Sequence, residues 1–145
     1  GFSGIDIRVN EKQMNQKAEN QYLNQAAPSD VAGLIKLVLE KDVLSAEHRK
    51  FLSDIMLKTS TGADKIKQGL PPGVIFGHKT GSSSRTADGI KIADNDAGFV
   101  TLTNGRTYYI AVMITESKLD DRANAALAAQ ISQTVYNYLT TEKTD

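Results

Sequence analysis

The chain has 145 residues, of which 40% are apolar, and this is enough for one packed domain or a large part of one. Its 17 lysines and arginines balance its 17 aspartates and glutamates, so no net positive field attracts a nucleic acid or an anionic membrane surface. The lack of cysteine excludes a disulfide, a thiol nucleophile and a thiolate metal site, and the two histidines are far apart. We therefore expect no metal, no cofactor, no nucleic-acid partner and no membrane partner.

The first 28 residues are polar and rich in Asn and Gln, and they hold neither a helical nor a strand period for long. A long irregular segment in a compact domain is usually functional or disordered. From Ser29 the pattern changes, and Ser29 is expected to cap a helix. The apolar positions of this helix recur at helical spacing: Val31, Leu34, Ile35, Val38 and Leu39.

A second helix is predicted after Ser45, with Phe51, Leu52, Ile55 and Met56 on one face. The stretch "TSTGADKIKQGLPPG" then predicts a turn, one or two helical turns, and a break at Pro71, Pro72 and Gly73. The helical part of the chain accordingly spans residues 29–70.

Three strands are predicted next, in "VIFGHKT", "AGFVTLT" and "TYYIAVMIT". Asn104 and Gly105 lie between the second and third strands and favour a tight hairpin turn, so these strands are expected to be antiparallel neighbours. The first two strands are separated by a long connection, "SSSRTADGIKIADND".

A final helix is predicted in "LDDRANAALAAQISQTVYNYL", with Leu127, Ile131, Val135 and Tyr138 on one face. Three strands and this helix thus occupy residues 73–145. The order of helices, antiparallel sheet and helix indicates an α/β fold in which helices flank an antiparallel sheet.

The search for a serine nucleophile gives a negative result. No serine is followed three places later by lysine, and no Gly-x-Ser-x-Gly motif occurs. "GHKTG" also lacks the spacing of a phosphate-binding loop. If serine chemistry takes place, the serine lies outside these 145 residues.

The residues that stand out are Glu11 and Asn15 in the N-terminal segment and the Lys79-Thr80-Gly81 stretch at a strand end. With them the chain resembles the class A serine β-lactamases, and within these the cephalosporinase-like branch. The resemblance runs in order through "NEKQMN", "PSDVAGLIKLVLEKDVLS", "STGADKIKQGLPPG", "HKTGSS", "ADNDAG" and "NGRTYYIAVMITES". It implies the serine β-lactamase/penicillin-binding fold, of which residues 1–145 form the C-terminal portion and residues 1–28 an omega-type catalytic loop.

The resemblance also implies roles for single residues. Glu11 matches the general base that activates a water to attack the acyl-enzyme, and Asn15 matches the residue that holds that water. Lys79 matches a strand lysine that sets the charge around the nucleophile and attracts the substrate carboxylate. Thr80 offers its hydroxyl to the same carboxylate.

Three further positions belong to the same strand end. Gly81 lacks a side chain, so a substrate can lie against the strand edge. The backbone N–H of Ser82 matches one of two oxyanion donors, a group whose loss typically costs about 2.7 to 4 kcal/mol of transition-state stabilisation. Ser83 is expected to shape the edge of the pocket.

The chain differs from the family pattern at several positions. The nucleophilic Ser-x-x-Lys motif and the Ser-Asp-Asn-type motif are expected upstream of Gly1, in an N-terminal segment that is therefore a partner. Lys65 is predicted to bind the substrate where many members have an arginine, and Asp94 occupies the alternative arginine position. Val9 and Asn24 lie near the places of the arginine–aspartate pair that usually holds the catalytic loop.

Two classes of function remain open. The first is hydrolysis of a β-lactam antibiotic in the periplasm through a serine acyl-enzyme. The second is a non-hydrolytic penicillin-binding or inactive fragment that folds only with a partner segment. A peptidase of the same fold is disfavoured because the glutamate-bearing loop is not typical of that class. His78 has no evident partner in the sequence and is predicted to be a structural strand residue that faces a helix.

Overall fold

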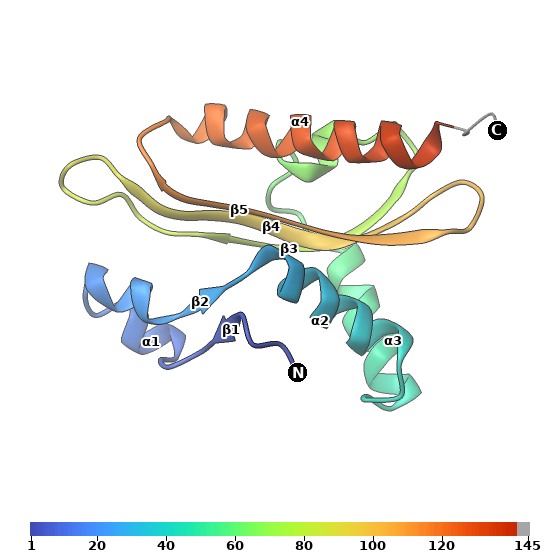
Figure 1. Ribbon diagram of the computed structural model, residues 1–145, viewed down its shortest axis with the longest axis horizontal. Helices are drawn as coiled ribbons and strands as arrows, with labels where there is room; N and C mark the ends of the chain where they lie inside the picture. The colour runs from blue at the N-terminus through green and yellow to red at the C-terminus, as the bar shows by residue number, and fades with distance from the viewer. Residues whose placement is uncertain (142–145) are drawn as a thin grey trace.

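The computed structural model describes residues 1–141 and places an antiparallel sheet between two layers of helices (Figure 1). The sheet contains β3 (Ile75–Ser82), β4 (Lys91–Thr101) and β5 (Thr107–Ser117) in the order β3-β4-β5. Each neighbouring pair is antiparallel. The predicted fold class, an antiparallel sheet flanked by helices, is thereby confirmed.

Two helices cover one face of the sheet, α2 (Pro28–Glu40) against β4 and β5 and α3 (Ala46–Leu57) against β3. The predicted cap of α3 is confirmed, because Oγ of Ser45 accepts a hydrogen bond from the backbone N–H of His48. The predicted Ser29 cap is wrong, since α2 already begins at Pro28. Proline is favoured in a first helical turn, where its missing N–H has no intrahelical partner to lose.

The other face is covered by α4 (Asp121–Thr140) and by the short 3-10 helix η2 (Ile66–Gly69). The buried positions of α4 are small or polar: Asn124, Ala125, Ala128 and Ser132. Of the predicted apolar face, only Val135 packs on the core, while the other three side chains are exposed. A Cβ on Gly69 would lie 2.1 Å from the carbonyl oxygen of Ala129, so this close approach of η2 to α4 selects small residues.

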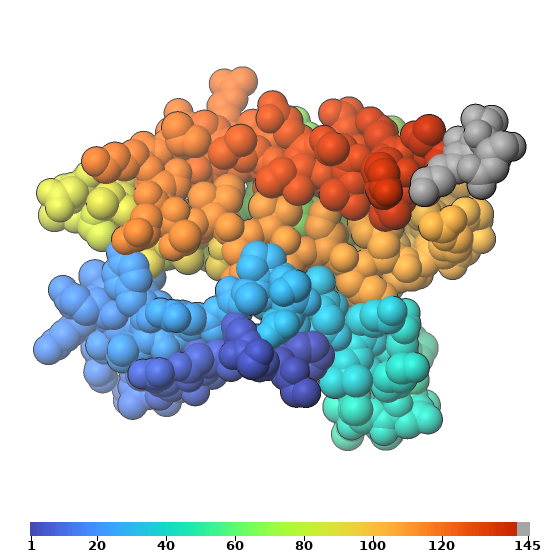
Figure 2. All heavy atoms as spheres, viewed as in Figure 1, coloured from blue at the N-terminus to red at the C-terminus, as the bar shows by residue number. Residues whose placement is uncertain are grey.

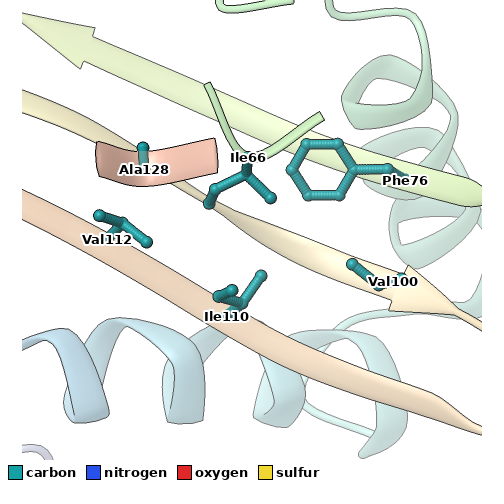
Figure 3. Packing of buried hydrophobic residues seen from close by; sticks show 6 residues of the cluster. All are labelled: Ile66, Phe76, Val100, Ile110, Val112 and Ala128. Carbon is teal, nitrogen blue, oxygen red and sulfur yellow. The ribbon is translucent and has the colours of Figure 1, made fainter. Parts of the chain in front are cut away.

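The core lies between the sheet and the layer of α4 and η2 (Figure 3). It consists of Ile66, Phe76, Val100, Ile110, Val112 and Ala128. Burial of these apolar side chains holds η2 against the strands. It contributes roughly 25 cal/mol of stabilising free energy per Å² of apolar surface removed from water. This side of the sheet is therefore closed, whereas the face toward α2 and α3 keeps hollows, which are described below.

The second strand is longer than its apolar pattern predicts. It begins at Lys91 instead of residue 97, and the connection from β3 shortens to residues 83–90. Asp94 and Asp96 occupy positions of β4 that point into the protein and are buried. Inward-facing carboxylates break the alternation by which a strand is recognised, and this explains the error.

The hairpin between β4 and β5 confirms the predicted antiparallel pairing. The N–H of Gly105 donates to the carbonyl of Leu102, and Gly105 adopts a φ of 81°. The side chain of Asn104 accepts from the N–H of Arg106. The asparagine thus stabilises the turn through its side chain, and the glycine provides the left-handed backbone.

Short ordered elements replace the irregular segment predicted at the N-terminus. Strands β1 (Ile5–Asp6) and β2 (Gln25–Ala26) pair antiparallel and close a loop, which contains α1 (Glu11–Met14) and the 3-10 helix η1 (Ala18–Leu23). We call residues 5–26 the N-terminal loop. It lies on the same side of the sheet as α2 and α3, opposite α4 (Figures 1 and 2). None of the helices described in residues 1–141 is long and apolar enough to cross a membrane.

Candidate active site

A cleft of about 490 Å³ lies between the N-terminal loop and the ends of β3 and β4. Glu11 and Asn15 line it from the loop, and Gly81, Ser82 and Ser83 line it from the strand end and the residue that follows. These residues are about 70 positions apart in the chain and meet only in the fold. We call this hollow the cleft.

Helix α1 presents Glu11 and Asn15 on the same side, because residues four apart are neighbours on a helix. A capping box starts the helix: the side chain of Asn10 accepts from the N–H of Gln13, and the Gln13 side chain accepts from the N–H of Asn10. Asn15 closes the turn with its N–H on the carbonyl of Glu11 at 3.1 Å. Both side chains are exposed to solvent and line the same cleft, so both can contact water there.

Asn24 holds the two ends of the N-terminal loop together. Its Oδ1 accepts from the N–H groups of Arg8 at 2.9 Å and Val9 at 3.1 Å, and its Nδ2 donates to the carbonyl of Val9 at 2.9 Å. Val9 and Asn24 cannot form the ion pair that usually holds this loop, so its conformation could not be predicted from the sequence. In the structure the Asn24 side chain holds the loop instead, through hydrogen bonds to the backbone of Arg8 and Val9.

We expect Asn24→Ala to loosen the loop, because three hydrogen bonds across its neck are lost, each worth about 0.5–1.5 kcal/mol. Hydrogen–deuterium exchange of residues 5–26 should rise by tenfold or more, while exchange in β4 and β5 should not change. Gln16→Ala is the matched control in the same loop, because the Gln16 side chain is exposed. Equal exchange in the two variants would contradict the role given to Asn24.

The backbone of β3 directs alternate amides toward its open edge. The N–H of Ser83 donates to the carbonyl of Ala93, so residues 83 and 93 form a hydrogen-bonded pair. In an antiparallel ladder such pairs alternate with pairs whose N–H and C=O groups point away from the partner strand. Ser82, opposite Asp94, belongs to the second kind, so its N–H points away from β4 at the edge that borders the cleft.

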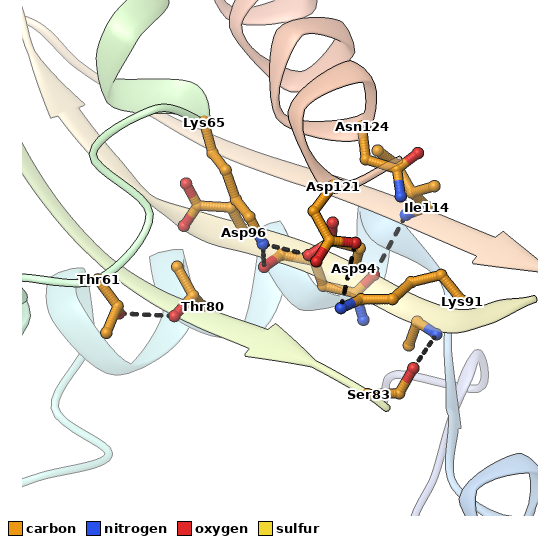
Figure 4. A network of polar contacts seen from close by, with 12 residues as sticks. Thr61, Lys65, Thr80, Ser83, Lys91, Asp94, Asp96, Ile114, Asp121 and Asn124 are labelled. Carbon is orange, nitrogen blue, oxygen red and sulfur yellow. Dashed lines mark hydrogen bonds and ion pairs between the residues drawn. The ribbon is translucent and has the colours of Figure 1, made fainter. Parts of the chain in front are cut away.

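Two threonines from the loop after α3 bind this edge of β3. Thr59 donates its hydroxyl to the carbonyl of His78 at 2.6 Å, and the hydroxyls of Thr61 and Thr80 lie 2.7 Å apart (Figure 4). Lys79 is exposed, and its ammonium donates to the carbonyl of Thr80. The loop therefore fixes the strand end while the Lys79 side chain stays accessible to solvent.

Lys79 and Thr80 line a second hollow instead of the cleft. This hollow has a volume of about 680 Å³ and lies between α2, α3 and the sheet, and we call it the apolar groove. Its walls are largely aliphatic: Val31, Leu34, Ile35, Val38, Leu52 and Ile55. Gly81, Asn95 and Met113 line both hollows, so the cleft and the apolar groove adjoin at the strand end.

Lys65 lies in neither hollow. Its ammonium pairs with Asp94 and reaches the carbonyl of Asn95 at 3.5 Å (Figure 4). The two side chains are 12% and 4% exposed. A lysine that is already paired with a buried carboxylate has less charge to offer a ligand, so the role predicted for Lys65 remains a prediction.

The connection after β3 is held in place at the far end of the cleft. Ser83 accepts from the N–H of Ala93 through its hydroxyl, at 3.0 Å. Arg85 donates to the carbonyl of Leu119 and to Asp121. The hydrogen bond from Arg85 lowers the pKa of Asp121, assisted by the charge of Lys91. This wall of the cleft is therefore tied to the start of α4.

Sequence reasoning missed several residues that shape the site. Asn24 was recognised only as lying near the place of the family's arginine–aspartate pair, and the sequence around Thr59 and Thr61 predicted only a turn. His78 is a buried strand residue as predicted, yet Asp96 pairs with it at 2.7 Å. The pairing could be found only through the register of β3 and β4, which a single sequence does not contain. Within residues 1–141 no group of three His, Cys, Asp or Glu side chains could hold a metal ion.

Comparison with known proteins gives a consistent result. Residues 2–139 match the model of the beta-lactamase enzyme family. The chain is 45% identical to a beta-lactamase from Bacteroides uniformis and 35% identical to beta-lactamase VEB-1 from Pseudomonas aeruginosa, with 94% of this chain and 46% of each relative covered. A crystal structure of a class A beta-lactamase from Bacteroides cellulosilyticus superposes with a TM-score of 0.93 at 45% identity, over 98% of this chain and 51% of that one.

The chain spans about half the length of the relatives that it matches. The match nevertheless extends over nearly all of its own residues, including the N-terminal loop and the Lys79-Thr80-Gly81 strand. The chain therefore belongs to the class A beta-lactamase family.

Proposed function

We propose that the chain is the C-terminal portion of an enzyme that hydrolyses the amide bond of β-lactam antibiotics and so confers resistance. One observation carries this proposal: Glu11 and Asn15 share a cleft with Gly81 and Ser82. A general base on one wall and a backbone amide donor on the other are what hydrolysis of an acyl-enzyme requires.

Deacylation is the step assigned to the N-terminal loop. Glu11 takes a proton from a water molecule that Asn15 helps to orient, and the water oxygen attacks the carbonyl carbon of the acyl-enzyme. The ester bond to serine then breaks, and the proton returns to the serine oxygen. Exposure of both side chains to the cleft supports this role.

The end of β3 is assigned to the acyl group and the substrate carboxylate. The N–H of Ser82 points away from β4 and can donate to the oxyanion, and Gly81 leaves room for a substrate along the edge. Lys79 has no acidic partner within residues 1–141 and can attract the carboxylate, with Thr80 beside it. Ser83 forms the edge of the pocket.

The nucleophile is assigned to an N-terminal segment that carries Ser-x-x-Lys. The apolar groove supports this assignment, because its aliphatic walls reach Lys79 and Thr80 at one end. A helix that filled the groove with its apolar face could place a serine next to both residues. The exposed Leu127, Ile131 and Tyr138 of α4 offer a second apolar surface to the same segment.

Hydrolysis in the periplasm follows from the proposed role, since β-lactams reach their targets there. No cofactor takes part in the proposed reaction.

The alternative function is that of a non-hydrolytic penicillin-binding protein. Glu11 distinguishes the two functions, because a protein that only binds penicillin does not need a general base beside the acyl group. A chromogenic cephalosporin, offered to the chain joined to its N-terminal segment, tests the proposal. Steady turnover supports it, and a single stoichiometric release favours the alternative.

Two lysine variants separate the proposed carboxylate contact from the buried ion pair. In the joined protein Lys79→Met should lower kcat/KM by about 10- to 150-fold, the equivalent of a hydrogen bond to a charged group, and mainly through KM. Lys65→Met should instead lower the melting temperature, because it leaves Asp94 buried without a partner, a change that typically costs about 3–5 kcal/mol.

Steady-state kinetics and thermal unfolding of both variants check this expectation. Lys65→Met combined with Asp94→Asn should regain most of the lost stability, because the buried charge is removed. If Lys65→Met raised KM as much as Lys79→Met and left the melting temperature unchanged, Lys65 would be the carboxylate anchor.

A further inference from the structure

A buried pair of side chains lies beneath the Lys79-Thr80-Gly81 wall and has no part in the mechanism proposed above. Nδ1 of His78 lies 2.7 Å from Oδ1 of Asp96 on the neighbouring strand. Their exposed fractions are 2% and 1%. A carboxylate can only accept hydrogen bonds, so Nδ1 carries the proton and donates to Asp96.

β3 and β4 approach each other closely at His78. His78 is opposite Gly98 in the register of β3 and β4. A Cβ on Gly98 would lie 2.8 Å from both Cα and Cβ of His78. The ring stacks on Phe76 with centroids 4.3 Å apart. Glycine at position 98 therefore allows β4 to approach the backbone of β3 closely, because a Cβ there would also lie 2.2 Å from the carbonyl oxygen of Gly77.

Apart from the backbone ladder with β4, few side chains hold the strand around His78. Gly77 and Gly81 flank the segment and have no side chains, and Lys79 is exposed. Thr80 is held from outside, through the hydroxyl of Thr61. Glycines contribute no side-chain contacts, so side-chain contacts between the strands here depend on the residues between them. On the interior side of residues 77–81, His78 is the side chain that ties β3 to β4.

Asp96 depends on its hydrogen bond from His78, because it has few other polar partners. The other carboxylate oxygen of Asp96 is buried without a hydrogen-bond partner. Asp94 projects from the same face of β4, but it already pairs with Lys65 (Figure 4). Within residues 1–141 His78 is thus the one hydrogen-bond donor to the Asp96 side chain. A buried carboxylate that depends on one donor holds that donor tightly.

We propose that His78 and Asp96 are positioning residues, which hold β3 so that Lys79 and the N–H of Ser82 reach the substrate. His78 is next to Lys79 in the chain, and its carbonyl receives the hydroxyl of Thr59 from outside the sheet. The residue is therefore held from both sides, by Asp96 through its ring and by Thr59 through its backbone. This inference rests on the proposed β-lactam hydrolysis only for its kinetic part.

The test compares three variants in the chain joined to its N-terminal segment. In His78→Asn the amide nitrogen can take the place of Nδ1, and we expect kcat/KM to stay within about threefold of the wild type. In His78→Leu no donor remains, and kcat/KM should fall about 10- to 150-fold, the equivalent of a hydrogen bond to a charged group. Amide hydrogen exchange of residues 79–82 should rise at the same time.

The double variant His78→Leu with Asp96→Leu separates positioning from mere stability. It removes the buried carboxylate, so the melting temperature lost in His78→Leu should return, because replacing both partners by apolar groups can be nearly neutral. The loss in kcat/KM and the faster exchange should persist. A double variant that regained kcat/KM together with its stability would overturn the proposal.

Two further outcomes are informative. If His78→Leu fails to fold, His78→Gln replaces it, since its amide cannot occupy the Nδ1 position. Gln and Asn variants of equal kcat/KM and equal exchange would also overturn the proposal. If the wild type shows no turnover, the proposed function fails, while exchange of residues 79–82 still tests the pair.

Discussion

Glu11→Gln is expected to lower turnover of a chromogenic cephalosporin by about 10²- to 10⁴-fold, the usual contribution of a general base. Glutamine has the size of glutamate and can still form hydrogen bonds, but it cannot take a proton from water. Because the role proposed for Glu11 is in deacylation, the acyl-enzyme should accumulate. The expected kinetic trace is a burst of about one equivalent followed by a slow steady rate.

Glu19→Gln is the matched control for this variant. Glu19 lies in η1 of the same N-terminal loop, and it does not line the cleft. It should therefore keep the turnover of the wild type. Turnover in Glu11→Gln as fast as in Glu19→Gln would show that Glu11 is not the deacylating base, whatever the role of the cleft.

The 145-residue chain alone is expected to show no turnover of a β-lactam. It contains Glu11 and the strand wall but no Ser-x-x-Lys motif. Without a nucleophile, Glu11 could only activate water against the unbound substrate, which loses the advantage of an oriented acyl group. Addition of the N-terminal segment should restore hydrolysis in proportion to the amount of complex formed.

The apolar groove suggests that the chain depends on the N-terminal segment for its stability as well as for the nucleophile. About 680 Å³ of largely aliphatic space lies open in the chain alone. We therefore expect the N-terminal segment to raise the melting temperature and to reduce binding of a hydrophobic dye, in step with the return of activity. Hydrolysis by the purified chain alone, at a rate that follows its concentration, would contradict the assignment of the nucleophile.

The fold could be predicted from the sequence wherever side chains follow a simple period. The Ser45 cap of α3 and the Asn104-Gly105 turn were readable, because local chemistry decides them, whereas Phe51 and Ile55 of the predicted apolar face of α3 are exposed. The start of β4 was not readable, because Asp94 and Asp96 point inward, where they pair with Lys65 and His78. The buried face of α4 was not either, because the close approach of Gly69 to the backbone of Ala129 and to Ser132 favours small residues there over leucine.

The site could be predicted in part. Of the residues that the resemblance named, the structure brings Glu11, Asn15, Gly81, Ser82 and Ser83 to one cleft. Lys79 and Thr80, named with them, line the adjoining apolar groove instead. The resemblance could not show that Lys65 pairs with Asp94, nor that Asn24 ties the loop through the backbone. Both are contacts between residues far apart in the chain, and their geometry depends on the fold and not on local pattern.

We propose that this chain supplies the base that deacylates a serine carried by another segment, a claim that can be tested directly. Its most direct test is peptide mass spectrometry of the joined protein with Glu11→Gln, after incubation with a β-lactam. We predict one acyl adduct per protein, on the serine of a Ser-x-x-Lys motif outside these 145 residues. An adduct on a serine of this chain, such as Ser82, or the absence of any trapped adduct during turnover, would contradict the claim.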